Sequence, residues 1–251
     1  MSLFFLLLSG LQIFNAHPTL YVGDQSGFQF ENAVLRIGAV RGPDGARGFT
    51  EFAGIRFDTT GVLGVSGAGE GAQARAFPAW ATIPSGQDLA TGRVVHFFFA
   101  WVLVFTLFVW FAASLLNRHL RRDIIPRVSD LKGLPADISS HARMQFRHEK
   151  SYGPLQKLAY AGVLLVALPL MVLSGLAMSP GFNAFAPFLA DVLGGRQTAR
   201  TIHFAVMALL VMFFVVHIVM VVAAGPVNEL RSIITGWYRV DAESGRGKGE
   251  R

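Results

Sequence analysis

The chain alternates between long apolar stretches and segments that are rich in charged residues and glycine. Three apolar stretches, residues 94–116, 158–178 and 201–224, contain 21 to 24 residues each and no aspartate or glutamate. A helix of about 20 apolar residues crosses the hydrocarbon core of a membrane. The pattern therefore predicts three transmembrane helices.

A fourth apolar stretch, residues 2–14, is too short to cross a membrane. Its 13 residues would cover about 20 Å as a helix. It also lacks the basic start and the small-residue cleavage site of a signal peptide. We expect it to be a truncated first span, the end of a longer helix that begins upstream of Met1 in the natural protein.

The segments between the spans predict how the chain is oriented. Residues 118–157 hold nine lysines and arginines against four acidic residues. Because basic loops stay in the cytoplasm, this loop and the tail, residues 225–251, are expected there. The tail begins with Gly225 and Pro226 and continues amphipathically, which is typical of a segment that lies along the membrane surface.

Residues 15–92 are then extracytoplasmic. This segment is rich in glycine, holds seven acidic residues and five arginines, and alternates apolar and polar residues near Ile37. Such alternation is typical of β-strands. We expect a small insertion of short strands and turns without a catalytic centre, because the sequence shows no metal-ligand cluster, nucleophile motif or phosphate-binding glycine loop there.

Composition agrees with a membrane protein. Hydrophobic residues make up 52% of the chain and charged residues only 15%, below the roughly 25% of soluble domains. The chain has no cysteine, which excludes disulfides, cysteine-ligated iron–sulfur clusters and covalent haem attachment within it. The net charge of +6 lies mainly in segments that flank the spans, so it reports topology and does not indicate nucleic-acid binding.

Two histidines on the last span carry the candidate chemistry. His203 and His217 are fourteen residues apart, close to four helical turns, so both project from nearly the same face about 21 Å apart. Imidazole is a common axial ligand of haem iron, and this spacing suits two stacked haems. The alternative is that both histidines hydrogen-bond to neighbouring helices.

An internal repeat extends this pattern to the other spans. Residues 91–97, TGRVVHF, match residues 198–204, TARTIHF, and residues 8–11, LSGL, match residues 173–176, LSGL. The chain is therefore expected to be an all-α, four-helix transmembrane bundle of two repeated helical hairpins. The extracytoplasmic insertion enlarges the first hairpin.

The repeat places His96 and His203 at equal depth, where they could ligate one haem between them. Arg93 and Arg200 lie one turn outward and could contact the haem propionates. Anchoring at the membrane interface is an equally good role for both arginines.

The repeat breaks at the second haem. Trp110, not histidine, stands fourteen residues after His96, so His217 has no counterpart on the second span. The expected partner is a histidine at the cytoplasmic start of the first helix, upstream of Met1.

These features resemble the four-helix, dihaem cytochrome b subunits of bacterial membrane oxidoreductases, of the nickel–iron hydrogenase, formate dehydrogenase gamma and thiosulfate reductase types. A subgroup associated with periplasmic molybdopterin oxidoreductases of the sulfite oxidase type is most similar over residues 8–21, 84–88, 91–98, 194–197 and 228–238. The resemblance implies one haem held by His96 and His203 and a second haem held by His217. No position matches the remaining ligand.

The other histidines and the small residues have less specific roles. His17 is expected to act at the helix end or membrane interface, and His119, His141 and His148 to be solvated in the cytoplasmic loop. Gly162 and Gly175 could permit close approach of a helix or a haem. Pro169 should kink the third span.

The sequence therefore predicts a multi-pass b-type cytochrome subunit of the bacterial inner membrane, without catalytic residues of its own. It would transfer electrons between an extracytoplasmic oxidoreductase and the quinone pool of the respiratory chain, and the resemblance implies that this partner is molybdopterin-dependent. Two haems b are expected in the full-length protein and one in the chain that starts at Met1. The alternatives are a haem-free membrane anchor and a transporter subunit with a histidine proton relay, although the latter predicts acidic residues in the spans.

Overall fold

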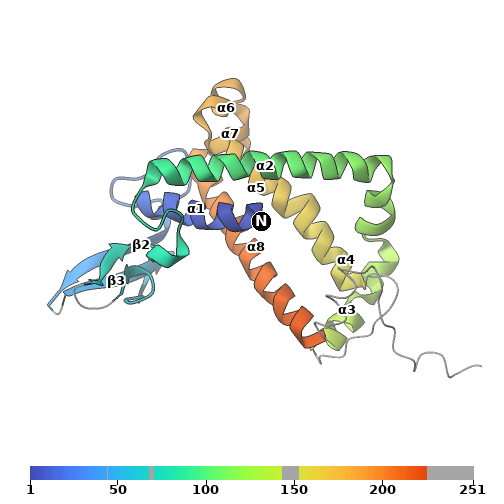
Figure 1. The fold of residues 1–251 in the computed structure, drawn as a ribbon, viewed down its shortest axis with the longest axis horizontal. Coiled ribbons are helices and arrows are strands. Elements are labelled where there is room, and N and C mark those ends of the chain that lie inside the picture. Colours follow the sequence, from blue (N-terminus) through green and yellow to red (C-terminus); the bar gives the residue numbers. More distant parts are fainter. Residues whose placement is uncertain (44, 68–70, 143–152, 225–251) are drawn as a thin grey trace, which may run out of the picture. The chain divides into compact units, whose positions relative to one another are not determined.

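The computed structural model describes residues 1–43, 45–67, 71–142 and 153–224. Figure 1 shows the helices and strands of the chain, which divides into two compact parts. The first part comprises Met1–Ala112 and Pro169–Met207, and the second comprises Ala113–Leu168 and Ala208–Arg251. The long helices α2 and α8 contribute residues to both parts.

The predicted spans form helices. Three helical stretches are long and apolar enough to cross a membrane: Leu89–Leu116, Pro154–Met178 and Arg196–Ala223. They correspond to α2 (Leu89–Leu116), to the continuous run of α4 (Pro154–Ala161), η4 (Gly162–Ala167) and α5 (Leu168–Met178), and to α8 (Arg196–Ala224). The first stretch forms the shorter apolar helix α1 (Ser2–Ala16).

The third span departs from regular α-helical geometry where the sequence predicted a kink. Its middle section, η4, is π-helical and ends two residues before Pro169. Proline has no N–H to donate, and a wider π-helical turn is one way in which a helix accommodates that loss.

Helices α2 and α8 each begin five residues before the apolar stretch that predicted them. Both beginnings are capped, which lets polar residues continue the helix beyond the hydrocarbon. The Asp88 carboxylate accepts a hydrogen bond of 3.0 Å from the Thr91 N–H in the first turn of α2. At α8, the Gly23 carbonyl accepts the N–H groups of Gln197 and Thr198, at 2.9 and 3.1 Å.

The insertion between α1 and α2 forms two small antiparallel sheets, as its alternating pattern predicted. The first sheet has the order β1-β2-β3-β4 and the second pairs β5 with β6. The strands are β1 (Thr19–Tyr21), β2 (Ala33–Gly42), β3 (Gly45–Phe52), β4 (Ile55–Asp58), β5 (Gly64–Ser66) and β6 (Gln73–Arg75). The longest pairing, between β2 and β3, closes at the Gly42–Gly45 turn.

A small apolar core joins the first sheet to the helices. Phe14 of α1, Leu20 of β1 and Ile37 of β2 are each at most 5% exposed and pack together. Phe204 of α8 packs against this cluster, and its ring centroid lies 4.8 Å from that of Phe14. The sheet is therefore fixed to both α1 and α8.

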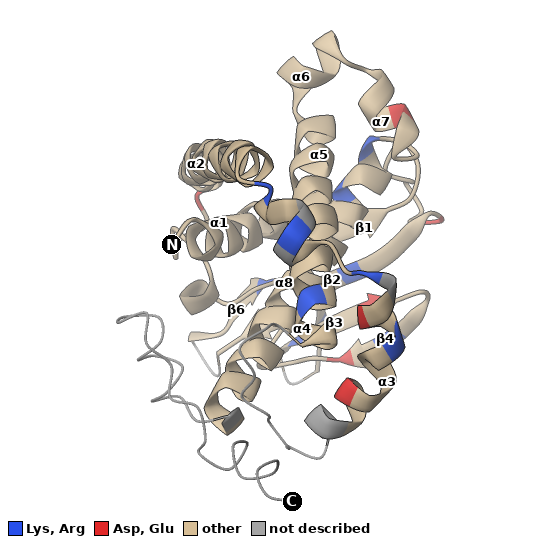
Figure 2. Ribbon diagram, turned by 90° about the vertical axis from the view of Figure 1, so that its right-hand side faces the viewer, with Lys and Arg blue, Asp and Glu red and all other residues tan. Residues whose placement is uncertain are grey.

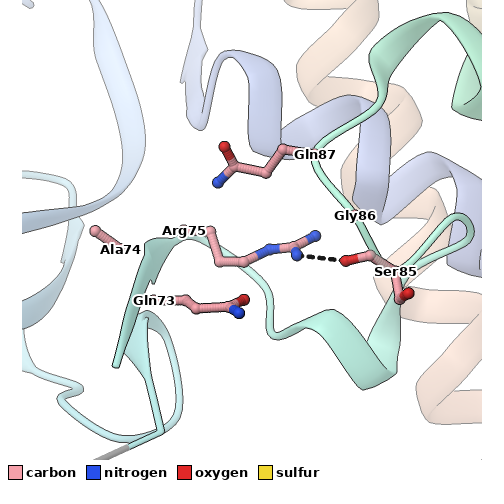
Figure 3. Close-up of a pocket in the computed structure, with 6 residues that line it drawn as sticks. All are labelled: Gln73, Ala74, Arg75, Ser85, Gly86 and Gln87. Carbon is pink, nitrogen blue, oxygen red and sulfur yellow. Dashed lines mark hydrogen bonds between the residues drawn. The ribbon is translucent and has the colours of Figure 1, made fainter. Parts of the chain in front are cut away.

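Arg75 makes a second connection, between β6 and α1. Its guanidinium donates to the Ser85 carbonyl at 2.7 Å (Figure 3) and to Gln12 Oε1 and Thr82 Oγ1 at 2.9 Å each. The side chain is only 6% exposed although it lines a small cavity with Gln73 and Gln87. These bonds hold the segment that leads into α2 against the first helix.

The remaining connections are more helical than the sequence predicted. The turn between the third and fourth spans contains α6 (Pro180–Phe185) and α7 (Phe188–Val192), and η2 (Ala79–Ala81) lies within the insertion. In the second part, the expected cytoplasmic loop contains η3 (Leu120–Ile124) and α3 (Val128–Ala142). Lys157 pairs with Asp130 of α3 at 3.2 Å.

Charged residues follow the predicted division between spans and connections. Helices α1, α2 and α5 are drawn almost entirely in tan, while red and blue segments lie on the strands and around α3 (Figure 2). The predicted amphipathic tail lies outside the described residues, as does His148, and the side chain of His141 is likewise outside them.

Candidate functional site

His96 and His203 lie next to each other in the first part of the structure. His96 follows the first residue of α2 by seven positions, and His203 follows the first residue of α8 by the same number. Their ring centroids are 6.4 Å apart, and the ring planes meet at 61°. The two copies of the repeated motif thus bring their histidines together, as the sequence predicted.

Each of these imidazoles contacts a serine on a second helix. Ser9 Oγ of α1 lies 3.1 Å from Nδ1 of His96, and Ser174 Oγ of α5 lies 3.1 Å from Nδ1 of His203. Both serines are 0% exposed. Both serines occupy the second position of an LSGL sequence. Each copy of LSGL therefore contacts one of the two repeated histidines through the same serine–imidazole contact.

The hydrogen bonds of the serines assign the protons on the imidazoles. Ser9 donates its hydroxyl proton to the Phe5 carbonyl at 2.6 Å, and Ser174 donates to the Leu170 carbonyl at 2.7 Å. A hydroxyl has one proton and then only accepts. Each Nδ1 therefore carries the proton that it donates to serine, which leaves the lone pair on Nε2.

Each imidazole also forms a hydrogen bond with the backbone of the helix that carries its serine. The Met171 carbonyl lies 3.1 Å from Nδ1 of His203, and the backbone of Leu6 forms a hydrogen bond with His96. Met171 and Leu6 each precede the serine of their own helix by three residues. The acceptors around the two imidazoles are thus equivalent in the repeat.

Gly10 and Gly175 leave room for the imidazoles. A Cβ atom added at Gly10 would lie 3.3 Å from Cε1 of His96, and one added at Gly175 would lie 3.4 Å from Cε1 of His203. Gly175 thus has the close approach that the sequence suggested. A Cβ at Gly162 would meet nothing within 4 Å, so the same role does not extend to that residue.

The distance between the two imidazole rings would let both of them bind one haem iron. Imidazole nitrogens bind such metals at about 2 Å, so two rings that share one iron would have centroids about 6 Å apart. Because the porphyrin supplies four nitrogens, two protein ligands suffice. Among the described residues, no group of three or more His, Cys, Asp or Glu side chains could hold a metal ion.

The two candidate propionate ligands differ. Arg93 is exposed, with its guanidinium carbon 5.7 Å from the centroid of the Phe97 ring. Arg200 is half-buried and donates to the backbone carbonyls of His17 and Thr19. The bonds of Arg200 hold the start of α8 against β1. Contact of either arginine with a haem propionate stays a prediction.

The remaining candidate residues have aromatic neighbours of their own. His217, in the second part, stacks on Phe213 with ring centroids 5.9 Å apart, and Trp110 contacts Phe111. His17 caps the end of α1 and stacks on Tyr21. Burial and the neighbouring Arg200 cation lower the pKa of His17 below its ordinary value.

The roles of Ser9 and Ser174 were not predicted from the sequence. The LSGL repeat indicates a duplicated hairpin, but by itself it assigns no role to its serine. The signal for this role is that a serine recurs in both LSGL copies, each on the helix that precedes a repeated histidine.

Comparison with known proteins finds a family that is similar to part of the chain. Residues 135–236 match the family described as prokaryotic cytochrome b561. This range includes His203 and His217 but not His96. The chain is also 29% identical, over 128 residues, to the putative protein-methionine-sulfoxide reductase subunit YedZ1 of Azospira oryzae.

The alignment with that relative covers 50% of this chain and 62% of the relative. The chain thus spans less than two thirds of the length of the curated relative that it matches. No solved structure matches the chain.

Proposed function

We propose that this member of the prokaryotic cytochrome b561 family is the membrane subunit that carries electrons between an extracytoplasmic oxidoreductase and the quinone pool. It is a multi-pass protein of the bacterial inner membrane. Its own contribution is a path through the membrane, and the chemistry on the substrate belongs to the partner subunit.

The adjacent pair of His96 and His203 supports this proposal most directly. Their 6.4 Å ring separation suits axial ligation of one haem b, and the serine contacts leave Nε2 of each ring able to bind iron. Two histidines that only hydrogen-bond to neighbouring helices would need neither this distance between their rings nor a free lone pair on both Nε2 atoms. Because His96 lies outside the residues that match the family, its assignment rests on this geometry and on the repeat.

Haem, when bound, supplies reversible one-electron transfer at its iron. The chain would hold it through the two Nε2 atoms and orient both rings through their Nδ1 bonds. The apolar flanks of α2 and α8 would exclude water from the iron. Arg93, which lies one helical turn outside His96, would face the propionates. Arg200 ties α8 to β1, and the N–H groups of its guanidinium that are not used in these bonds could also donate to a propionate.

The partner is proposed from the relative and from the predicted topology. The printed name of the relative describes a putative subunit of a protein-methionine-sulfoxide reductase. A periplasmic oxidoreductase with a molybdopterin cofactor, docked at the extracytoplasmic side, is the corresponding partner of this chain.

His217 is proposed as a ligand of the second haem, nearer the cytoplasm. Its position four turns after His203 on α8 matches the distance between two stacked haems. Helix α2 offers no counterpart to it, because Trp110 stands fourteen residues after His96. A four-helix bundle of two repeated hairpins with two haems b is the corresponding proposal for fold and cofactor content.

Purification of the full chain from bacterial membranes tests the proposal. Reduced-minus-oxidised absorbance should show a b-type α-band, and pyridine haemochrome analysis should count the haems. His96→Ala and His203→Ala should each remove the same low-spin haem. His217→Ala should leave that haem in place, and His17→Ala is the matched control because His17 lies outside the spans.

The outcomes separate the alternatives. A wild-type chain without haem would leave a haem-free anchor or a proton-relay subunit. Full haem content and an unchanged spectrum in both His96→Ala and His203→Ala would show that these two residues are not the ligands, whatever the remaining function.

A further inference from the structure

We infer that Ser9 and Ser174 are a matched pair of positioning residues that set the orientation of the two histidine ligands and lower the reduction potential of the haem between them. This inference rests on the proposed haem ligation by His96 and His203. It concerns two residues that neither the family match nor the relative assigns to the site.

Ordinary helix chemistry does not account for both contacts of each serine. Serine and threonine in membrane helices often donate to the carbonyl four residues earlier, and Thr106 of α2 does so at 2.7 Å to Val102. Thr106 is exposed, and this bond satisfies its proton. Ser9 and Ser174 make the same bond and also accept the Nδ1 proton of an imidazole at 3.1 Å.

The full burial of the serines makes these contacts specific. An Nδ1–H in an apolar surrounding must find an acceptor, because water is absent there. A serine that has already given its proton to the helix backbone can only accept. The imidazole therefore cannot turn over without losing its bond, so one nitrogen stays directed at serine and Nε2 stays available to the iron.

An acceptor at Nδ1 also changes the electronic character of the ligand. When the Nδ1 proton is drawn toward an acceptor, Nε2 becomes more basic and donates more strongly to the metal. Stronger donation favours ferric over ferrous iron and so lowers the reduction potential. Because both axial ligands have the same serine contact, the effect should act from both faces of the haem.

The test uses the full chain with Ser9→Ala, Ser174→Ala and the double variant, and Thr106→Ala as the matched control. Redox titration should show an upward shift of the potential of the His96/His203 haem in each single variant and a larger shift in the double variant. Electron paramagnetic resonance of the ferric haem should show altered g-values as the rings lose their fixed orientation. Thr106→Ala should behave as the wild type.

Ser9→Thr and Ser174→Thr serve as conservative variants, because threonine keeps an accepting hydroxyl. They should restore the wild-type potential and g-values. If the alanine variants lose haem, restoration of haem by threonine supports positioning, whereas loss in the threonine variants too would overturn it in favour of simple space filling. A wild-type potential and unchanged g-values in the double alanine variant would also overturn it.

These results are distinct from failure of the proposed function. The proposed function fails if the wild-type chain holds no haem or if His96→Ala and His203→Ala keep it. The inference on the serines fails while haem ligation stands if only the serine variants are without effect.

Discussion

The imidazole rings of His96 and His203 lie with their centroids 6.4 Å apart, although 107 residues separate them in the sequence. Each ring is approached in the same way by one serine and one glycine of an LSGL motif. The two halves of the site are therefore equivalent in detail, down to the hydroxyl that accepts each Nδ1 proton. This equivalence leads to a prediction about the space beside the rings.

Enlarging either glycine beside a histidine should weaken haem binding. The Cβ of Gly10→Val or Gly175→Val would already touch the imidazole at 3.3 or 3.4 Å, and the further methyl groups must displace the ring. Overpacking of this kind costs about 1–3 kcal/mol, so haem affinity should fall about tenfold or more. Haem content per purified protein measures the effect.

Gly162→Val is the matched control, because a Cβ at that position meets nothing within 4 Å. It should retain the haem content of the wild type. Equal haem content in all three variants would contradict the proposed tight contact between glycine and ligand.

Reporter fusions should reveal the predicted orientation of the chain. Fusions within residues 118–157 and after residue 251 should be active as cytoplasmic reporters, because the basic residues of that loop favour the inner side. A fusion at the β2–β3 turn should be active only as an extracytoplasmic reporter. An extracytoplasmic loop at 118–157 would reverse the orientation, and it would move the His96/His203 site to the cytoplasmic side.

Loss of the Arg75 guanidinium should destabilise the first part of the structure. Arg75→Met removes three hydrogen bonds and leaves the buried oxygens of Gln12 and Thr82 without that donor. A loss of about 3 kcal/mol is expected, since bonds to charged groups contribute about 1.5–3 kcal/mol each and are not additive. The thermal unfolding midpoint should fall, whereas Arg56→Ala, which breaks an exposed pair with Glu51, should change it little.

Arg75→Lys refines this test. Lysine keeps the charge but cannot present the planar fork that reaches three acceptors. Its midpoint should lie between those of the wild type and Arg75→Met. A midpoint equal to that of the wild type would show that charge alone holds this connection.

The start of α2 should depend on pH through Asp88. Hydrogen bonds from the hydroxyl and N–H of Thr91 lower the pKa of Asp88 below its ordinary value. A carboxylate with a lowered pKa stabilises the fold above its unfolded pKa of about 3.9, and this stabilisation is lost as pH falls through the folded value. The midpoint difference between wild type and Asp88→Ala should therefore be full at neutral pH and shrink below pH 4.

Asp88→Asn provides the comparison, because asparagine also caps helices but carries no charge. The midpoint difference between Asp88→Asn and Asp88→Ala should hardly vary with pH. A pH-independent difference between wild type and Asp88→Ala would rule out a charged cap at this position.

The sequence was sufficient for the spans and for the pairing of His96 with His203, because apolar length and a repeated motif are both local signals. It could not show where the helices begin, since the caps of α8 come from Gly23, more than 170 residues earlier in the chain. The helices α3, α6 and α7 were also missed, because short helices in connecting segments carry weak periodicity. The role of the serines depended on contacts between helices that no single stretch of sequence contains.

The first turns of α8 are fastened to the strand that follows α1. Gly23 donates to Thr198 Oγ1 at 2.7 Å, Thr201 donates to the Tyr21 carbonyl at 2.6 Å, and Arg200 donates to the Thr19 carbonyl at 3.1 Å. Gly195, with φ of +104°, lies so close to Gly23 that a Cβ there would approach its backbone to 2.5 Å.

A protein that docks on the sheet would therefore exert force on β1, which is hydrogen-bonded to Thr201, two residues before His203. Force on the insertion would reach the helix turn that carries His203 through the hydrogen bonds from Thr201 and Arg200 to the carbonyls of β1. Excision of the insertion would remove the outer frame of the histidine pair, and would not simply shorten an appendage.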